Sequence, residues 1–419
     1  MGSFYIKGPK KLSGKVRISG SKNEALKLIP LSICVKGAVT IKNVPKILDI
    51  SSQLEIFEHL GGTYKFDEDL ILDATKVSRS SALCDKAKSL RASIVYLGPL
   101  LARFKKAQVP FPGGCAIGSR PIDTHLDAFR DLGANITIDG SVVSLAIGEV
   151  TADRITLKEK SVSATENVLL FLSAIKSRVK VSNCAVEPEI LHLVEILKEA
   201  GARITQVDDR TFDVEGSEDL EIEHIEVMPD RIEAGTFAIA FLATGGEGEI
   251  TPFEEDHLGS LVDVLRGCGA TINIDKNKRV CKVAPAKEYK SFKIRTGPYP
   301  EFPTDLQSPM ALIASRANGT SSINETMFEN RLGYLKNLGK MGLKYEVVDK
   351  HNANITGLTG LCASRLESPD LRSGITMLLA AIMANGESRI DMAEIIDRGY
   401  ENIEVKLNKL GADIKRVDG

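Results

Sequence analysis

Residues 132–138 read L-G-A-N-I-T-I, a glycine set between an amphipathic segment and a run of alternating apolar and polar residues. A glycine in that setting is typical of a helix that ends on a left-handed residue and leads into a strand. We therefore predict a helix–strand junction at this point of the chain.

Closely similar junctions recur at five other places along the chain. They read L-G-G-T-Y-K-F (60–66), A-G-A-R-I-T-Q-V (200–207), C-G-A-T-I-N-I (268–274), M-G-L-K-Y-E-V (341–347) and L-G-A-D-I-K-R-V (410–417). Taking Gly62, Gly133, Gly201, Gly269, Gly342 and Gly411 as equivalent gives separations of 71, 68, 68, 73 and 69 residues. Near-equal intervals of this kind predict six copies of one supersecondary repeat.

Each repeat contains two kinds of helix. The helix before the marking glycine is amphipathic, whereas an earlier one, such as 236–243, is apolar around most of its circumference. A helix of the second kind is buried on several sides. The strands, such as 179–183, alternate and are expected to expose one face. We predict an α/β fold of βαβαββ-type repeats with buried helices and outer sheets.

Length and composition narrow the class of protein. At 419 residues the chain exceeds one ordinary core, so we expect two domains of three repeats each. The 54 Lys and Arg balance 56 Asp and Glu, which argues against bulk attraction to nucleic acid or membrane. The N-terminus shows no apolar signal core, and stretches such as 375–384 are too short to span a bilayer.

The seven cysteines are scattered and form no C-x-x-C pair. That pattern favours neither a disulfide framework nor a zinc site, and it indicates a reducing cytoplasm. We expect six of them to be inert, small apolar residues. Cys115 differs because it follows Pro-Gly-Gly in a long loop near Arg120, and on sequence chemistry alone a functional role is as plausible as an inert one.

Basic residues recur where the apolar helices begin, at Lys22, Arg91, Arg231 and Arg372. A cation is locally unfavourable at a helix N-terminus, whereas an anion is attracted there. The pattern of four basic residues at equivalent positions therefore predicts an anionic ligand. For any one of them taken alone, the alternative is an ordinary solvated charge on the protein surface. A second set, Cys115, Arg120, Arg331 and Arg398, lies on corresponding loops after short strands. Taken singly, His125 reads as a capping or surface residue and Phe328 as a core residue.

Five stretches carry a resemblance to a known family. They are S-G-S-K-N-E-A-L (19–26), P-G-G-C-A-I-G-S-R-P-I-D (112–123), F-P-T-D-L-Q (302–307), F-E-N-R (328–331) and I-D-R-G-Y (396–400). They closely resemble the UDP-N-acetylglucosamine enolpyruvyltransferases of the EPSP synthase superfamily, and the likeness covers nearly the whole chain. It implies two inside-out α/β barrel-like domains, 22–229 and 1–21 plus 230–419, with the active site in the cleft between them.

The activity implied by the resemblance is transfer of the enolpyruvyl group of phosphoenolpyruvate to the 3′-hydroxyl of UDP-N-acetylglucosamine, with release of phosphate. That is the first committed step of peptidoglycan precursor synthesis, in the cytoplasm, and it links the family to cell shape, the cell cycle, cell division and the antibiotic fosfomycin. A shikimate-3-phosphate enolpyruvyltransferase and a catalytically weak UDP-sugar-binding paralogue remain alternatives. The likeness implies no metal, organic cofactor, nucleic acid or membrane partner, and a monomer or weak oligomer.

The resemblance also assigns roles to residues. Cys115 would be the general acid and Asp305 the base, while Lys22, Arg120 and Arg398 would hold phosphoenolpyruvate with help from Arg91 and Arg372. Asn23 would contact the tetrahedral intermediate. The UDP-sugar would be held by Arg120, Pro121, Asp123, His125, Ser161, Val162, Ser163, Asp305, Met327 and Phe328. Arg231 and Arg331 join the substrate-binding set through their equivalent positions in the repeats.

Three positions depart from the family's usual pattern, namely Thr124, Ser163 and Glu301. Thr124 and Ser163 belong to the expected nucleotide region, so they could weaken uridine binding or favour a related nucleotide sugar. Lys160 is the expected lysine near the nucleotide phosphates, with its register uncertain by one residue.

Overall fold

The computed structural model describes residues 2–111 and 122–417. These form two compact units, one made of residues 20–111 and 122–228 and the other of residues 2–19 and 229–417. We call them the 20–228 unit and the 229–417 unit. Cys115, Arg120 and Pro121 lie outside the described residues.

The third repeat shows the building plan in full. Its elements are β9 (Arg154–Thr156), α6 (Val162–Ser173), β10 (Arg178–Ser182), α7 (Pro188–Glu199), β11 (Arg203–Asp208) and β12 (Thr211–Glu215). β9 runs parallel to β10, and β12 lies antiparallel between β10 and β11. The predicted βαβαββ order is confirmed in this repeat.

The other two repeats of the 20–228 unit vary the plan. The first comprises α1 (Lys22–Leu31), β3 (Ala38–Lys42), α2 (Leu48–His59), β4 (Thr63–Phe66), β5 (Leu70–Asp73) and β13 (His224–Glu226). The second comprises α3 (Asp85–Ser89), η1 (Arg91–Tyr96), α4 (Leu97–Phe104), β6 (Lys106–Pro110), α5 (Asp123–Asp131), β7 (Asn135–Asp139) and β8 (Val142–Ala146). β13 supplies the parallel opening strand beside β3, whereas in the second repeat that strand is reduced to a bridge between Ser81 and Gln108.

The 229–417 unit also holds three repeats, and two of them take a strand from the chain's N-terminal segment. The fourth repeat comprises β2 (Ser13–Arg17), α8 (Arg231–Ala243), β14 (Glu247–Thr251), η2 (Glu255–His257), α9 (Gly259–Gly267), β15 (Thr271–Asp275) and β16 (Val280–Ala284). The fifth comprises β17 (Tyr289–Lys290), β18 (Lys293–Arg295), α10 (Thr304–Arg316), β19 (Ala317–Asn318), β20 (Thr320–Asn324), α11 (Tyr334–Lys340), β21 (Lys344–Val347) and β22 (Asn352–Thr356). The sixth comprises β23 (Arg365–Glu367), α12 (Leu371–Met383), β24 (Gly386–Asp391), α13 (Glu394–Asp397), α14 (Ile403–Lys409), β25 (Ile414–Val417) and β1 (Ser3–Gly8).

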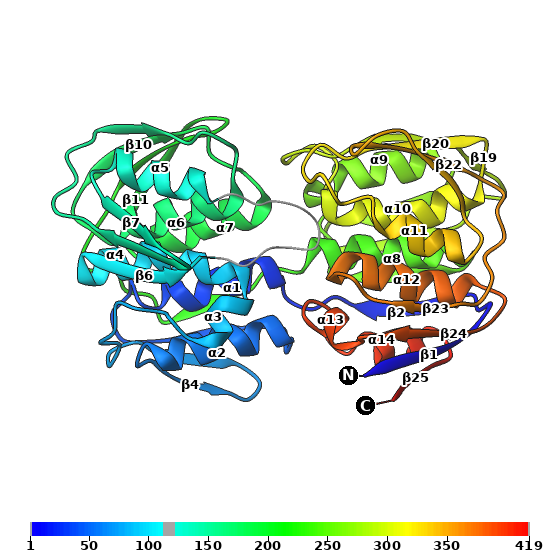
Figure 1. Cartoon of the computed structure of the whole chain (residues 1–419), viewed down its shortest axis with the longest axis horizontal. Coiled ribbons are helices and arrows are strands. Elements are labelled where there is room, and N and C mark those ends of the chain that lie inside the picture. Colours follow the sequence, from blue (N-terminus) through cyan, green and yellow to red (C-terminus); the bar gives the residue numbers. More distant parts are fainter. Residues whose placement is uncertain (1, 112–121, 418–419) are drawn as a thin grey trace. The chain divides into compact units, whose positions relative to one another are not determined.

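The borrowed strands occupy regular places in their sheets. β2 runs parallel to β14 as the opening strand of the fourth repeat, and β1 lies antiparallel between β24 and β25 (Figure 1). The sixth repeat is thus closed by the first strand of the chain. The sequence did not predict this exchange, because the alternation within a strand does not reveal which distant strand it pairs with.

The cores are built from the apolar helices, as predicted. In the 229–417 unit α10 packs against both α8 and α12, and nearly every residue of these helices is buried. In the 20–228 unit α6 packs against η1 and α4 in the same way. The strands alternate, as in β10, where the buried residues are Val179 and Val181. Helices inside and sheets outside match the α/β architecture predicted from the sequence.

The marking glycines adopt the left-handed conformation, with one correction. Gly133, Gly201, Gly269, Gly342 and Gly411 have φ between 98° and 113°. In the first repeat the left-handed residue is Gly61, with φ of 103°, and the choice of Gly62 was wrong. Gly61 directly follows Leu60, which caps α2, and the left-handed residue comes immediately after the cap. Position 62 favours glycine for a different reason, because a Cβ there would lie only 2.4 Å from the Phe57 ring.

Within residues 2–111 and 122–417, the chain crosses from one unit to the other at residues 19–20 and 228–229, and a buried glutamate binds the backbone beside each crossing. Glu24, the third residue of α1, accepts a hydrogen bond from Met228 N at 2.6 Å and also contacts His192 Nδ1. Glu233, the third residue of α8, accepts one from Ser19 N at 2.7 Å and one from Lys406 Nζ at 2.6 Å. The start of each helix is therefore tied to the neighbouring connection within its own unit.

Membrane-spanning helices were not expected. Within residues 2–111 and 122–417, none of the helices has both the length and the apolar character needed to cross a bilayer.

Candidate functional site

In the 20–228 unit, Lys22 is the first residue of α1 and is only 9% exposed. Its Nζ lies 2.8 Å from Asp49 Oδ2, on α2, and Asp49 is 5% exposed. The Ser21 hydroxyl caps the helix by accepting from Glu24 N at 3.4 Å. Lys22 is therefore a fixed, buried cation at a helix start, and the alternative of a solvated surface charge is excluded for it.

His125, on α5, is the centre of a buried hydrogen-bond network. Its Nδ1 accepts from Asn167 Nδ2 at 3.0 Å, and its Nε2–H then points at Ser163 Oγ, also at 3.0 Å. Asn167 is fixed in turn, because it donates to Ile94 O at 2.8 Å and accepts from Gly98 N at 2.7 Å. With 3% exposure His125 is neither a helix cap nor a surface residue, and that interpretation was wrong.

The same burial decides the charge of His125. Desolvation, helped by the positive charges of Arg91 and Lys27, lowers the pKa of its imidazole to about 3. The ring is therefore neutral at physiological pH. A neutral ring that accepts at one nitrogen can donate at the other, so it orients the Ser163 hydroxyl at the start of α6.

We expect His125 to make the protein sensitive to acid. An unfolded histidine takes up a proton near pH 6.5, whereas the folded one does so only near pH 3, so stability falls as pH falls between those values. When the unfolded state binds one proton more than the folded state, the free energy of unfolding changes by about 1.4 kcal/mol per pH unit. Urea unfolding of His125→Gln between pH 6.5 and 4 should show a slope smaller by about that amount. The exposed His224→Gln serves as the control, and an unchanged slope in His125→Gln would contradict the assignment.

The remaining predicted residues of this unit also lie at the starts of helices that pack together. Arg91 begins η1, Asp123 begins α5, and Ser161 caps α6 by accepting from Ala164 N at 3.3 Å. α6 packs against η1 and α5, and α1 packs against η1. Asn23, Val162 and Ser163, at the starts of α1 and α6, are half-buried.

The structure shows the surroundings of the three residues that depart from the family pattern. Ser163 is the partner of His125, and Thr124 is buried with 7% exposure. Glu301 is exposed in the other unit and bonds to Arg295 Nη1 at 2.5 Å.

In the 229–417 unit, the centre of the candidate site is the carboxylate of Asp305, the second residue of α10. Arg331 Nη2 lies 2.7 Å from its Oδ1, and Arg372 Nε and Nη2 lie 3.0 and 2.9 Å from its Oδ2. Both arginines are 5% exposed, whereas the side chain of Asp305 is 25% exposed. Two buried guanidiniums therefore hold one partly accessible carboxylate through charge-assisted bonds.

Arg372 is itself held in place by its surroundings. It is the second residue of α12, after the capping residue Asp370, which accepts from Arg372 N at 3.0 Å. Its guanidinium lies over the Tyr400 ring, 5.4 Å from the centroid, and the Tyr400 hydroxyl lies 2.9 Å from Thr236 Oγ1 on α8. Arg398, which caps α13, is two residues from Tyr400, and Arg231 begins α8. The predicted cations of this unit thus lie at the ends of neighbouring helices.

Met327 and Phe328 lie between β20 and α11. Met327 is 37% exposed and Phe328 is half-buried, so the reading of Phe328 as a core residue was wrong. The Phe328 ring lies 5.6 Å from the Arg331 guanidinium, which in turn contacts Asp305. The sequence missed the residues that fix this set, namely Asp49, Asn167, Tyr400 and Glu325, since each is defined by partners distant in the chain.

The cysteines that the structure describes differ in burial: Cys184, Cys268 and Cys281 are buried, Cys34 and Cys84 are half-buried, and Cys362 is exposed. Burial raises the pKa of Cys184 and Cys281 to about 12 and that of Cys268 to about 11. The thiol of Cys34 also has a pKa raised to about 12 by burial. Cys362 is exposed and lies in the connection between β22 and β23, so burial does not protect its thiol.

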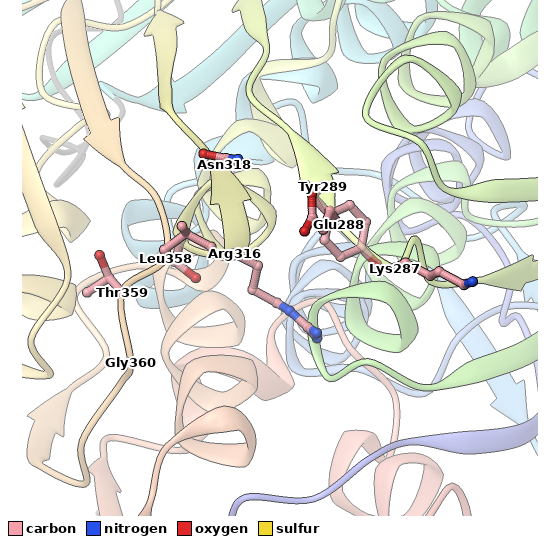
Figure 2. A pocket seen from close by; sticks show the side chains of 9 residues that line it. Lys287, Glu288, Tyr289, Arg316, Asn318, Leu358, Thr359 and Gly360 are labelled. Atoms are coloured by element: carbon pink, nitrogen blue, oxygen red, sulfur yellow. The ribbon is translucent and has the colours of Figure 1, made fainter.

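A hollow of about 370 Å³ lies elsewhere in the 229–417 unit, at the end of α10 (Figure 2). Its lining includes Lys287, Tyr289, Arg316 and Thr359, and none of the predicted site residues. Arg316 donates to Ala243 O at 2.8 Å and the Tyr289 hydroxyl to Leu242 O at 2.9 Å, so both serve the end of α8. We regard this hollow as separate from the candidate site.

Comparison with known proteins gives a consistent result. The family model for EPSP synthase (3-phosphoshikimate 1-carboxyvinyltransferase) matches residues 6–407. Proteins named UDP-N-acetylglucosamine 1-carboxyvinyltransferase from Campylobacter fetus and Desulforapulum autotrophicum are 40% and 38% identical to the chain, and each match covers 100% of both proteins.

Two solved structures share the fold. The enolpyruvyl transferase NikO from Streptomyces tendae has a TM-score of 0.90 at 23% identity, over 100% of this chain and 99% of that one. EPSP synthase from Acinetobacter baumannii has a TM-score of 0.75 at 16% identity, over 100% of both chains. At these identities the two structures support the two-part α/β architecture and nothing finer.

Proposed function

The chain belongs to the EPSP synthase family, and within it to the UDP-N-acetylglucosamine 1-carboxyvinyltransferases. We therefore propose that it transfers the enolpyruvyl group of phosphoenolpyruvate to the 3′-hydroxyl of UDP-N-acetylglucosamine and releases phosphate. It is a transferase of peptidoglycan precursor synthesis. The observation that carries the proposal is the Asp305 carboxylate held between two buried arginines, in a chain about as long as its relatives and 37–40% identical to them.

The chemistry explains why such a site is needed. The methylene carbon of phosphoenolpyruvate must gain a proton and the sugar hydroxyl must lose one as it adds. The resulting methyl group must then lose a proton as phosphate leaves, which restores the double bond. These steps need a general acid, a base and several cations. We assign the acid to Cys115 and the base to Asp305. The carboxylate and phosphate of phosphoenolpyruvate fall to Lys22, Arg91, Arg120, Arg372 and Arg398.

Arg372 connects the base with the donor substrate. Its guanidinium binds Asp305, and an anionic substrate would offer it a competing partner. Binding of phosphoenolpyruvate would therefore draw Arg372 from Asp305 and leave the carboxylate freer to accept the sugar hydroxyl's proton. A base that is unmasked by its co-substrate fits a reaction in which both substrates must be present.

The rest of the proposal follows the resemblance. We propose that the two units correspond to the two domains expected from the sequence and that residues of both serve one active site. Asn23, Asp123, Ser161, Val162, Ser163, Arg231, Met327, Phe328 and Arg331, together with Pro121 and His125, complete the substrate-binding set. His125 acts through Ser163, since both ring nitrogens are engaged within the protein. We further propose a cytoplasmic monomer or weak oligomer that supports cell-wall growth, cell shape and division.

The alternatives are less well supported. Shikimate-3-phosphate as acceptor would fit the family model equally well, but the full-length relatives at 37–40% identity carry the UDP-sugar name. A binding-only paralogue would need neither a general acid nor a base.

The test is phosphate release from phosphoenolpyruvate with UDP-N-acetylglucosamine or shikimate-3-phosphate as acceptor, followed by mass analysis of the product. Release with the UDP-sugar alone, giving its enolpyruvyl ether, is the expected result. Release with shikimate-3-phosphate alone would overturn the acceptor, and tight UDP-sugar binding without release would favour the binding-only paralogue.

A further inference from the structure

Glu325 lies directly after β20 and two residues before Met327, and its side chain is 0% exposed. A buried carboxylate is costly unless its oxygens are hydrogen-bonded, so the groups it binds indicate its role.

The Glu325 carboxylate joins three separate segments. Its Oε1 accepts from the backbone N–H groups of Met327 at 2.8 Å and Phe328 at 3.2 Å, and from Thr296 Oγ1 at 3.0 Å. Its Oε2 accepts from Thr304 Oγ1 at 2.7 Å. Thr304 is the first residue of α10 and the neighbour of Asp305. One side chain therefore binds both the 327–328 loop and the helix start that carries the proposed base.

The backbone of Glu325 is fixed as firmly as its side chain. Its N–H donates to His351 O at 2.7 Å, and His351 Nδ1 donates to its carbonyl oxygen at 2.7 Å. The carboxylate accepts four hydrogen bonds from groups within the protein, three on Oε1 and one on Oε2, and the residue has no exposed surface. Glu325 is therefore suited to hold other groups in place, and poorly suited to contact a substrate itself.

We propose that Glu325 is a positioning residue for the acceptor substrate. It sets Met327 and Phe328 for contact with the nucleotide sugar and keeps them in register with Asp305 through Thr304. This inference rests on the proposed function, which assigns Met327 and Phe328 to the UDP-sugar and Asp305 to its hydroxyl. Phosphoenolpyruvate is assigned to other residues, so its binding should be affected less.

Glu325→Ala removes all four bonds, and we expect it to raise KM for the UDP-sugar at least about 10-fold, which corresponds to the loss of one good hydrogen bond to a charged group. KM for phosphoenolpyruvate should change less than about 3-fold. In the substrate-free protein the amides of Met327 and Phe328 should exchange with solvent faster. Thr244→Val is the matched control, since it removes a buried acceptor from Leu12 N at the far end of α8 and should alter stability but not the ratio of the two KM values.

Two further variants keep the test decisive if Glu325→Ala does not fold. Glu325→Gln keeps an acceptor for the two amides and can donate to the Thr304 hydroxyl, so it should restore most of the UDP-sugar KM. Thr304→Val loses the α10 link alone, so kcat should fall more than KM rises. Equal rises of both KM values, or unchanged amide exchange in Glu325→Ala, would overturn the positioning role alone. A wild-type protein without UDP-sugar turnover would overturn the proposed function and the substrate named here with it.

Discussion

Asp305→Asn is expected to lower kcat by about 100- to 10,000-fold, the range for removing a general base. The amide is nearly isosteric and keeps one oxygen for Arg331 or Arg372, but it cannot take the hydroxyl proton. Because Asp305 is 25% exposed, the loss should fall on kcat more than on folding. Steady-state phosphate release with both substrates saturating measures the effect, and thermal unfolding checks that the variant is folded.

The chain offers a matched control for this experiment. Asp391 is also a carboxylate held by two arginines, with Arg365 Nε at 2.8 Å and Arg389 Nε at 2.6 Å. It lies at the end of strand β24, in one of the outer sheets. Asp391→Asn should therefore keep kcat within about twofold while also losing the charge that binds two arginines, here more exposed ones. If Asp305→Asn retained more than a tenth of the wild-type kcat, or if Asp391→Asn lost as much, the assignment of Asp305 as base would be wrong.

The architecture could be predicted from the sequence because the same local pattern of apolar and polar residues recurs six times. Glycine at a helix–strand junction and apolar residues on all sides of a helix are signals that need no knowledge of partners. The pairing of strands from distant parts of the chain could not be predicted, because it depends on partners and leaves no local signal. β1, β2 and β13 alternate like any other strand, and only the three-dimensional pairing shows that each completes a sheet with a strand far away in the chain.

The same distinction applies to the candidate site. Basic residues at helix starts stood out in the sequence because they occupy equivalent positions in different repeats, as Lys22, Arg231 and Arg372 do. The groups that give them their properties could not be predicted. Asp49 neutralises Lys22 from another helix, and Arg372 and Arg331 converge on Asp305 from different segments. His125 looked ordinary because its burial arises from packing between α5 and α6.

Cys115→Ser is expected to reduce kcat by about 100- to 10,000-fold, since a serine hydroxyl is a far weaker acid than a thiol. Cys115→Asp should retain more activity because a carboxylic acid can also donate a proton. The same measurement of phosphate release, with both substrates saturating, compares the three proteins. Activity of Cys115→Ser equal to that of the wild type would remove Cys115 from the role of general acid.

Fosfomycin gives an independent measurement, because the resemblance implies that its epoxide alkylates this cysteine. Cys34, Cys184, Cys268 and Cys281 are poor competitors, because burial raises the pKa of each thiol to about 11 or 12 and the thiolate is the reactive form. Among the cysteines that the structure describes, Cys362 is the exposed one, and it serves as the control. Intact mass after incubation with fosfomycin and UDP-sugar should show one adduct in the wild type and in Cys362→Ser, and none in Cys115→Ser. An adduct that disappears in Cys362→Ser and persists in Cys115→Ser would mean that surface reactivity, and not the chemistry of the site, selects the thiol.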